Sequence, residues 1–201
     1  MPTEAPSADA PRVLILVAAG SEEIETIVPG DVLVRAGCAV TYAGLGSTAL
    51  TGSRGLPLAA DTTIEDLAAS EERFDALVIP GGGEGAKNLG ASAAVRDVLI
   101  DHAEAGALIA AICAAPAAVL APAGLLDGRR ATCYPGWEQH FRGSTTHETA
   151  RVVVDDGVIT SRGPGTAFDF ALTIAAELRD PETARGVAED MLLPIRQPAG
   201  A

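Results

Sequence analysis

A cysteine at a predicted strand-to-helix turn is the most reactive feature of this 201-residue sequence. Cys113 follows the apolar run at 107–112 and precedes Ala114 and Ala115, with Pro116 in a position that suits the first turn of a helix. A helix N-terminus favours the thiolate by about 0.3–2 kcal/mol, which lowers the thiol pKa by roughly 0.2–1.5 from about 8.5. The alternative is a small, inert, buried side chain. Its position leads us to interpret Cys113 as a nucleophile.

A nucleophilic thiol needs a group that takes its proton, and the histidines are poorly placed for this task. His102 falls in a predicted helix, whereas His140 and His147 fall in a polar stretch, so we interpret all three as structural or solvated. Glu25 falls in the first turn of the helix after the first strand, at the sheet edge where Cys113 also lies. A solvated surface carboxylate is the simpler interpretation. If Glu25 instead points inward, burial and like-charge repulsion couple the two groups, and a protonated Glu25 can hydrogen-bond a Cys113 thiolate.

The remaining cysteines and a glycine-rich stretch give weaker signals. Cys38 and Cys133 lie in strand-like segments and are interpreted as inert, although Cys133 could line a pocket. The odd number and irregular spacing of the cysteines match neither a disulfide framework nor a zinc ligand set, so we predict no metal site. Serial glycines at 81–85 could bind an anion, but Lys87 is flanked by Ala86 and Asn88 rather than by the glycine and the serine or threonine of a phosphate loop, and the spacing of a dinucleotide motif is missing. We expect a tight turn there, with a possible role for its backbone donors.

Alternating strands and helices must position these residues. Short apolar runs predict strands at 12–20, 38–45, 74–80, 107–112, 131–134, 151–155 and 158–161. Ser21 is expected to cap the first helix, Pro29 to kink it and Gly37 to end it. Further helices are predicted at about 92–105, 114–124, 166–178 and 182–190. This alternation predicts an α/β fold with a mostly parallel sheet and helices on both faces.

The composition indicates one domain without a nucleic-acid or membrane partner. Hydrophobic residues make up 48% of the chain and aromatic residues only 3%, so small aliphatic side chains must fill the core. We expect a proline-rich N-terminal tail at 1–11, one domain at 12–193 and a C-terminal tail at 194–201. The net charge of -13 argues against nucleic-acid binding. The sequence shows no membrane span and no export signal, which predicts a cytoplasmic protein.

Five segments in order resemble the DJ-1 branch of the DJ-1/ThiJ/PfpI superfamily: GSEEIET, VIPGGGEGAKNL, AAICAAP, TCYP and TSRGPGTAFDFAL. The resemblance covers roughly residues 12–193. It implies a flavodoxin-like (Rossmann-like) three-layer sandwich and a homodimer. It also implies a reactive cysteine at a nucleophile elbow with a nearby glutamate, which match Cys113 and Glu25. The family's backbone donors match Gly82 and Ala114, which could hold an oxyanion. The pocket positions that the resemblance implies are Gly83, Tyr134, Arg35, Arg54, Arg162 and Pro164.

Two departures from the family pattern narrow the expected function. The peptidase-like branch has histidine directly after the nucleophile, where this chain has Ala114, so we do not expect peptide hydrolysis. The animal branch has histidine where Tyr134 stands, whereas similar bacterial members often carry an aromatic residue there.

The resemblance implies a cofactor-independent, cysteine-dependent detoxification of 2-oxoaldehydes. Such an enzyme is similar to glyoxalase III or a protein deglycase, and acts on small aldehydes such as methylglyoxal or on early glycation adducts. The alternative is an oxidative-stress sensor or chaperone that uses oxidation of Cys113 without turnover.

Overall fold

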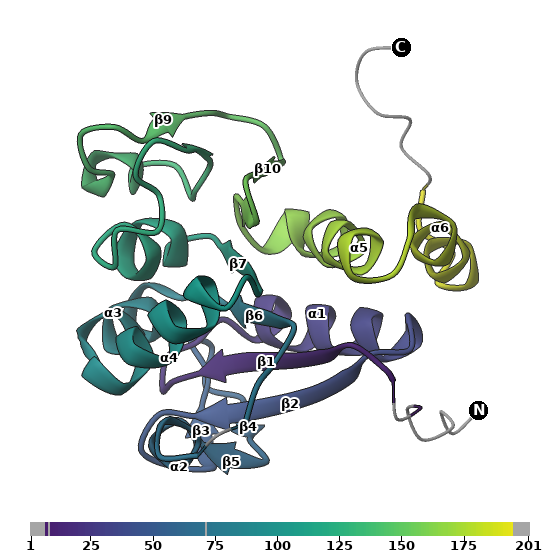
Figure 1. Cartoon of the computed structure of the whole chain (residues 1–201), viewed down its shortest axis with the longest axis horizontal. Coiled ribbons are helices and arrows are strands. Elements are labelled where there is room, and N and C mark those ends of the chain that lie inside the picture. The colour runs from purple at the N-terminus through teal and green to yellow at the C-terminus, as the bar shows by residue number, and fades with distance from the viewer. Residues whose placement is uncertain (1–6, 8, 71, 195–201) are drawn as a thin grey trace.

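A seven-stranded, mostly parallel β-sheet forms the centre of the fold (Figure 1). The structure is a computed structural model that describes residues 7, 9–70 and 72–194. The strands of this sheet are β1 (Arg12–Val17), β2 (Ala39–Gly44), β5 (Thr62–Thr63), β6 (Ala76–Ile79), β7 (Leu108–Ile112), β10 (Val152–Asp155) and β11 (Val158–Ser161). Their spatial order is β10-β11-β7-β6-β1-β2-β5. Within the described residues every neighbouring pair is parallel except β10 and β11.

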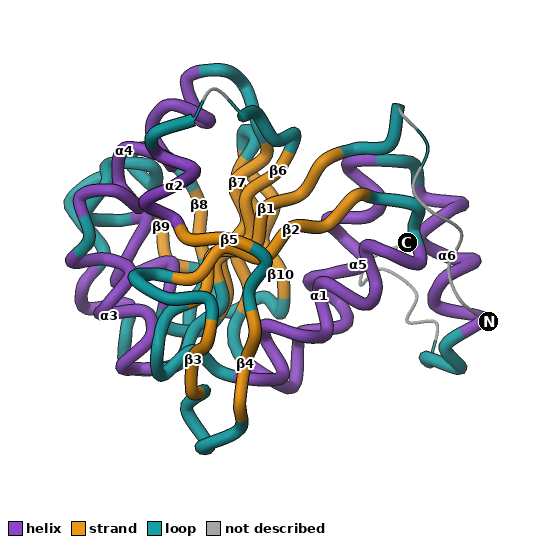
Figure 2. Tube along the Cα trace, turned by 90° about the horizontal axis from the view of Figure 1, so that it is seen from below, coloured by secondary structure: helices purple, strands orange, loops and turns teal. Residues whose placement is uncertain are grey.

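Helices cover both faces of the sheet, which gives three layers (Figure 2). One face carries α1 (Glu23–Arg35), α5 (Ala167–Leu178) and α6 (Pro181–Asp190). The other face carries α2 (Ile64–Ala68), α3 (Gly83–Ala91) and α4 (Ala93–Glu104). Taken in chain order, β1, β2, β6, β7 and β11 have the spatial order 2-1-3-4-5 of flavodoxin-like folds. The predicted flavodoxin-like α/β sandwich is therefore confirmed.

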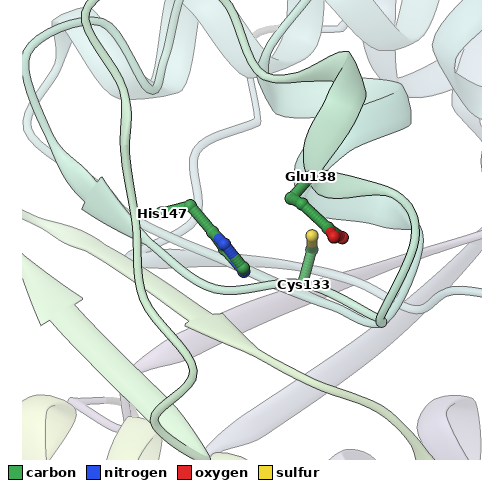
Figure 3. A group of neighbouring side chains, drawn as sticks. All are labelled: Cys133, Glu138 and His147. Atoms are coloured by element: carbon green, nitrogen blue, oxygen red, sulfur yellow. The ribbon is translucent and has the colours of Figure 1, made fainter.

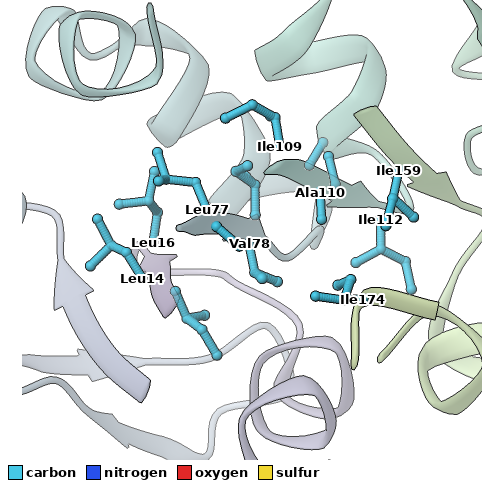
Figure 4. Close-up of a cluster of buried hydrophobic side chains, with 14 of the residues drawn as sticks. Leu14, Leu16, Leu77, Val78, Ile109, Ala110, Ile112, Ile159 and Ile174 are labelled. Atoms are coloured by element: carbon cyan, nitrogen blue, oxygen red, sulfur yellow. The ribbon is translucent and has the colours of Figure 1, made fainter. Parts of the chain in front are cut away.

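The core consists of aliphatic side chains from both faces of the parallel strands (Figure 4). In β1, all residues after Arg12 are buried, as expected for a strand covered on two sides. Leu14 and Leu16 of β1 join Leu77 of β6 and Ile109 of β7 in this cluster. The sheet that carries the site is thus a rigid, closely packed support.

Two small two-stranded sheets are separate from the seven-stranded sheet. The strands β3 (Ala49–Thr51) and β4 (Pro57–Ala59) form an antiparallel hairpin in the glycine- and threonine-rich segment. The strands β8 (Arg130–Ala131) and β9 (Thr146–His147) pair in parallel.

The expected strand at 131–134 is wrong beyond its first residue. Thr132 donates its backbone N–H to the Thr160 side chain at 2.9 Å, and Tyr134 donates to the carbonyl of Cys113 at 2.8 Å. These two amides are therefore unavailable to a strand ladder, and Cys133 lies in a loop after β8.

The start of the first helix also differs from the expectation. Ser21 does not cap it, because the Ser21 hydroxyl accepts from Ala18 N at 3.0 Å. Glu22 is the cap instead, since its carboxylate accepts from Glu25 N at 2.9 Å. Pro29 lies inside α1, and the kink expected there stays a prediction.

Helix α3 was not expected, and the helix after Cys113 has an unexpected form. The sequence of α3 contains three glycines, each of which disfavours a helix by about 1 kcal/mol relative to alanine. Tertiary packing compensates: Ala86 and Leu89 are fully buried. A Cβ atom on Gly90 would lie 2.1 Å from the carbonyl of Ala118, so glycine permits the close approach of the next segment. That segment, Pro116–Leu120, is a π-helix rather than an α-helix.

The predicted tails lie mostly outside the described residues, which exclude 1–6, 8 and 195–201. Ala10 is buried, and the Pro11 carbonyl accepts from Ala39 N at 2.8 Å. Contact with the sheet therefore begins within the expected N-terminal tail. No helix in the described part of the chain is long and apolar enough to cross a membrane.

Candidate active site

Cys113 occupies the predicted turn at the carboxyl end of β7. Its φ angle is 65°, which is uncommon for a residue with a side chain. Backbone hydrogen bonds hold it there: Cys113 N donates to the Ser161 carbonyl at 2.9 Å, and its own carbonyl accepts from Tyr134 N. Such strained geometry costs of order 1–3 kcal/mol and persists only where the surroundings impose it. The two neighbouring segments thus fix the direction of the thiol.

Glu25 points inward, as the functional interpretation required. It lies in the first turn of α1, and its side chain is fully buried. Its Oε2 atom accepts from Gly81 N at 2.8 Å. A Cβ atom on Gly81 would lie 2.6 Å from Glu25 Oε2 and 3.0 Å from Cys113 Sγ, so the carboxylate and the thiol flank the same glycine. The other oxygen, Oε1, is buried without a hydrogen-bond partner among the described residues.

The pKa values of Glu25 and Cys113 depend mainly on burial, and that of Cys113 differs from the sequence-based expectation. Burial, together with the charge of Glu22, raises the pKa of Glu25 to about 7, against the lowering effect of hydrogen bonds from Cys113 and Gly81 N. Burial and the charge of Glu25 raise the pKa of Cys113 to about 12. The predicted fall in the thiol pKa is therefore wrong in direction, because desolvation outweighs the backbone donors. At a pH between these two pKa values, Glu25 is ionised and Cys113 keeps its proton, so the pair holds one proton.

The backbone N–H groups of Gly82 and Ala114 act on the Cys113 thiol. Both lower its pKa, against the larger effect of burial. Gly82 has a φ of 87°, and a Cβ atom there would lie 2.2 Å from the Gly20 carbonyl. Only glycine fits this turn, which presents its N–H to the thiol.

A cavity of about 410 Å³ opens onto the sulfur. Predicted site residues that line it are Cys113, Gly82, Gly83, Ala114, Tyr134, Arg54 and Pro164. Five residues that were not among the named candidates also line it: Gly20, Glu22, Ser53, Glu84 and Trp137. Glu25 is not a lining residue; it is fully buried, and its carboxylate lies beside Gly81 and Cys113.

A sequence profile of the DJ-1/PfpI family matches residues 11–177. The chain belongs to the DJ-1/PfpI family. The Parkinson disease protein 7 homolog of Danio rerio is 44% identical over 185 residues, which cover 90% of this chain and 97% of the relative. The glutathione-independent glyoxalase DJR-1.2 of Caenorhabditis elegans is 36% identical over 182 residues, which cover 90% of this chain and 95% of the relative.

Solved structures of DJ-1 proteins agree with the fold. The crystal structure of a DJ-1 superfamily protein from Salmonella typhimurium superposes with a TM-score of 0.87 at 37% sequence identity. The match covers 92% of this chain and 99% of that structure.

Two arginines predicted from the DJ-1 resemblance are not among the cavity-lining residues. Arg35 lies in the last turn of α1, where its guanidinium pairs with Asp31 at 3.0 Å. Arg162 donates from Nη1 to the Thr149 carbonyl at 3.0 Å. Neither residue is placed at the cavity wall, so their expected pocket role is not supported.

Glu23, which was not among the predicted site residues, holds the β3–β4 hairpin at the cavity of this DJ-1/PfpI protein. Glu23 is buried, and its carboxylate accepts from Arg54 N at 2.7 Å and from the Ser53 hydroxyl at 3.1 Å. These bonds tie the β3–β4 turn to the start of α1, which places Ser53 and Arg54 at the cavity. The run of acids at 22–25 is the sequence signal that could have indicated such a role.

Proposed function

We propose that this protein is a cofactor-independent glyoxalase in which Cys113 is the nucleophile and Glu25 moves the protons. The observation that carries the proposal is a buried carboxylate with a pKa raised to about 7, beside a thiol that opens onto a cavity. An acid–base group with a pKa near neutrality is the most effective at neutral pH. The relative named as a glutathione-independent glyoxalase supports the reaction class.

In the first step, the Cys113 sulfur adds to the aldehyde carbon of a 2-oxoaldehyde such as methylglyoxal. A C–S bond forms, the carbonyl electron pair moves to oxygen, and the proton shared by the pair is transferred through Glu25 to that oxygen. The product is a hemithioacetal. The N–H groups of Gly82 and Ala114 lie beside the sulfur, where they can stabilise negative charge that develops on the oxygen.

In the second step, Glu25 removes the proton from the carbon that carries sulfur and returns it to the adjacent carbon through an enediol. The first carbon is oxidised to a thioester and the second is reduced to an alcohol, so the reaction needs no external oxidant or reductant. Water then cleaves the thioester, which frees Cys113 and releases a hydroxy acid; methylglyoxal gives lactate. Glu25 Oε1, which has no partner among the described residues, is the oxygen suited to carry the proton.

The same addition to a carbonyl carbon would serve early glycation adducts, so a deglycase activity belongs to this proposal. The cavity of about 410 Å³ accommodates small aldehydes and short adducts.

The test compares methylglyoxal loss and lactate formation by the wild type, Cys113→Ala and Glu25→Gln, with Cys38→Ala as a matched control. Cys38 is a buried thiol that does not line the cavity. We expect the two site variants to lose at least about 100-fold in rate, as for loss of a nucleophile or general base, and the control to keep its activity. Scavenging of the aldehyde by buffer must be subtracted. Equal rates in all four proteins contradict the proposal.

A redox sensor is the second candidate, and the donors around the sulfur favour it. The N–H groups of Gly82 and Ala114 stabilise negative charge at this position, and a sulfinate formed with two equivalents of peroxide carries such charge. A gain of two oxygens on Cys113 alone, without aldehyde turnover, would select the sensor. Rapid turnover by a protein whose stability does not change on oxidation would select the enzyme.

The proposed assembly is a homodimer. Ile24 and Ile27 on α1 are about half exposed, at 48% and 51%, and such apolar side chains are typical of a covered surface. Light scattering on the wild type and on Ile27→Lys tests this: a dimer that the substitution dissociates supports it, whereas a monomeric wild type contradicts it.

A further inference from the structure

Three side chains with metal-binding chemistry converge outside the proposed active site. Cys133, Glu138 and His147 each offer one ligand atom, and these atoms all lie within 4.8 Å of one another. Figure 3 shows the three side chains pointing toward a common centre. The sequence did not reveal this group, because its members come from three separate segments.

The backbone brings these residues together by itself. His147 lies in β9, which pairs with β8 through Ala131, and Cys133 follows that strand. Glu138 begins a short 3₁₀ turn, and its Oε2 atom accepts from Gly136 N at 2.6 Å. The arrangement is therefore part of the fold.

The chemistry of the three ligands selects the ion. A cysteine sulfur, a histidine nitrogen and a carboxylate oxygen form a mixed set typical of Zn²⁺, whereas Mg²⁺ and Ca²⁺ take oxygen ligands. We propose that Cys133, Glu138 and His147 bind one Zn²⁺ ion, with a water molecule or a further ligand completing a tetrahedral site. The bound thiol gives its proton to solvent, so one thiolate and one carboxylate balance the two charges of the ion.

The geometry permits this with a small contraction. Zinc bonds of about 2.0–2.3 Å in a tetrahedron place ligand atoms roughly 3.2–3.7 Å apart. Atoms that lie as much as 4.8 Å apart here must therefore approach one another by about 1.1–1.6 Å. Cys133 is buried, Glu138 is half-buried and His147 is exposed, so the site has a fixed inner ligand and an outer ligand that can close over the ion.

A zinc ion at this position would stabilise one wall of the cavity. Tyr134 and Trp137 both line the cavity, and in the sequence they lie between the proposed ligands Cys133 and Glu138. Bonds from the ion to β9 would fix this loop to the body of the domain, so the proposed role is structural.

The experiment measures binding of Co²⁺, as a spectroscopic probe, and of Zn²⁺ in competition with it, to full-length protein freed of metal by a chelator. We expect one equivalent of Co²⁺ with a thiolate-to-cobalt absorption band, which Zn²⁺ removes. Cys133→Ser and His147→Gln should each bind at least about tenfold more weakly, since even loss of a residue that merely orients a ligand costs about 10–100-fold.

Matched controls separate this site from other thiols and imidazoles. Cys113→Ala removes the proposed nucleophile, Cys38→Ala removes another buried thiol, and His140→Gln removes a neighbouring exposed histidine. All three should bind like the wild type. The proposal is overturned if the wild type binds no metal, or if any of these controls weakens binding as much as Cys133→Ser or His147→Gln does.

A second readout guards against misfolding of the Cys133 variant. Zn²⁺ should raise the melting temperature of the wild type and of His140→Gln but not that of His147→Gln, in which the substituted side chain is exposed. An equal rise in His147→Gln contradicts the proposed ligand set.

Discussion

The backbone N–H of Gly81 donates to Glu25 Oε2 at 2.8 Å, and this bond fixes the buried carboxylate beside the thiol. The glycine has no space for a side chain, since a Cβ atom would lie 2.5 Å from Cys113 Cβ and 2.6 Å from Glu25 Oε2. The close approach of the proposed acid–base group and nucleophile therefore depends on a residue that contributes only backbone.

Gly81→Ala should consequently damage both activity and stability. The added methyl group must displace the carboxylate or the thiol, so we expect at least about a tenfold loss in kcat/KM. The free energy of unfolding should fall by about 1–3 kcal/mol, the usual cost of overpacking. Glyoxalase kinetics and urea denaturation measure the two effects.

Gly186→Ala is the matched control for that substitution. Gly186 is exposed in α6, and a Cβ atom there would meet no atom within 4 Å. Its free energy of unfolding should rise by about 0.5–1 kcal/mol, because alanine is the better helix former. A Gly81→Ala protein that is as stable and active as Gly186→Ala would show that the crowding at Gly81 has no consequence.

The pH dependence of the rate should report the titration of Glu25. The proposed mechanism needs a carboxylate that accepts a proton, and the pKa of Glu25 is raised to about 7 by burial and by the charge of Glu22. The value of kcat/KM should therefore be low at pH 5.5, rise through about pH 7 and reach a plateau near pH 8.5. Initial rates in overlapping buffers test this. A flat profile over this range argues against Glu25 as the base.

The same shift predicts how stability depends on pH. A carboxyl group whose pKa is higher in the folded chain than its ordinary value of 4.5 holds its proton more tightly when folded. Between pH 4.5 and 7 the folded state therefore binds more protons than the unfolded state. The stabilisation that protonated Glu25 contributes is consequently lost as the pH rises through that range. The difference between the ordinary pKa of 4.5 and the folded value of about 7 corresponds to a loss of up to about 3 kcal/mol in the free energy of unfolding.

Glu25→Gln removes this titrating group and should remove the effect. Urea denaturation at pH 5 and pH 8 is expected to show a larger loss of stability for the wild type than for Glu25→Gln. If both proteins lose the same free energy of unfolding, Glu25 does not bear the raised pKa.

The proximity of Cys113 and Glu25 was predictable from sequence because position in an α/β fold restricts what a residue can contact. Cys113 and Glu25 each follow a buried strand, and parallel strands present their carboxyl ends at one edge. The parallel sheet was also predictable from the apolar runs, because strands that are covered on both faces have continuous hydrophobic sequences.

The parts that sequence did not predict depend on contacts between distant segments. The pKa of Cys113 was expected to fall because a helix terminus is visible locally, whereas the depth of burial that raises it is not. Helix α3 is rich in glycine and is stabilised by packing rather than by propensity. His147 approaches Cys133 only because β9 pairs with β8.

Trp137 gives a prediction about substrate binding that is separate from the chemistry. It is the single tryptophan of the chain, it lines the cavity, and Lys87 Nζ lies 5.9 Å from the centre of its ring. It is not placed against Cys113 or Glu25 by any hydrogen bond in the described residues. Trp137→Ala should therefore raise KM about fivefold or more while kcat changes little, because a wall residue contributes binding rather than proton transfer.

The conservative variant makes this prediction specific. Trp137→Phe keeps an aromatic wall and should leave KM within about twofold of the wild type, since most of the apolar contact is retained. Steady-state kinetics with methylglyoxal, together with thermal melts to establish that both variants fold, provide the measurement. A fall in kcat of the folded Trp137→Ala protein with KM unchanged would place the tryptophan in the reaction itself, because loss of a wall contact weakens the binding of substrate and transition state alike.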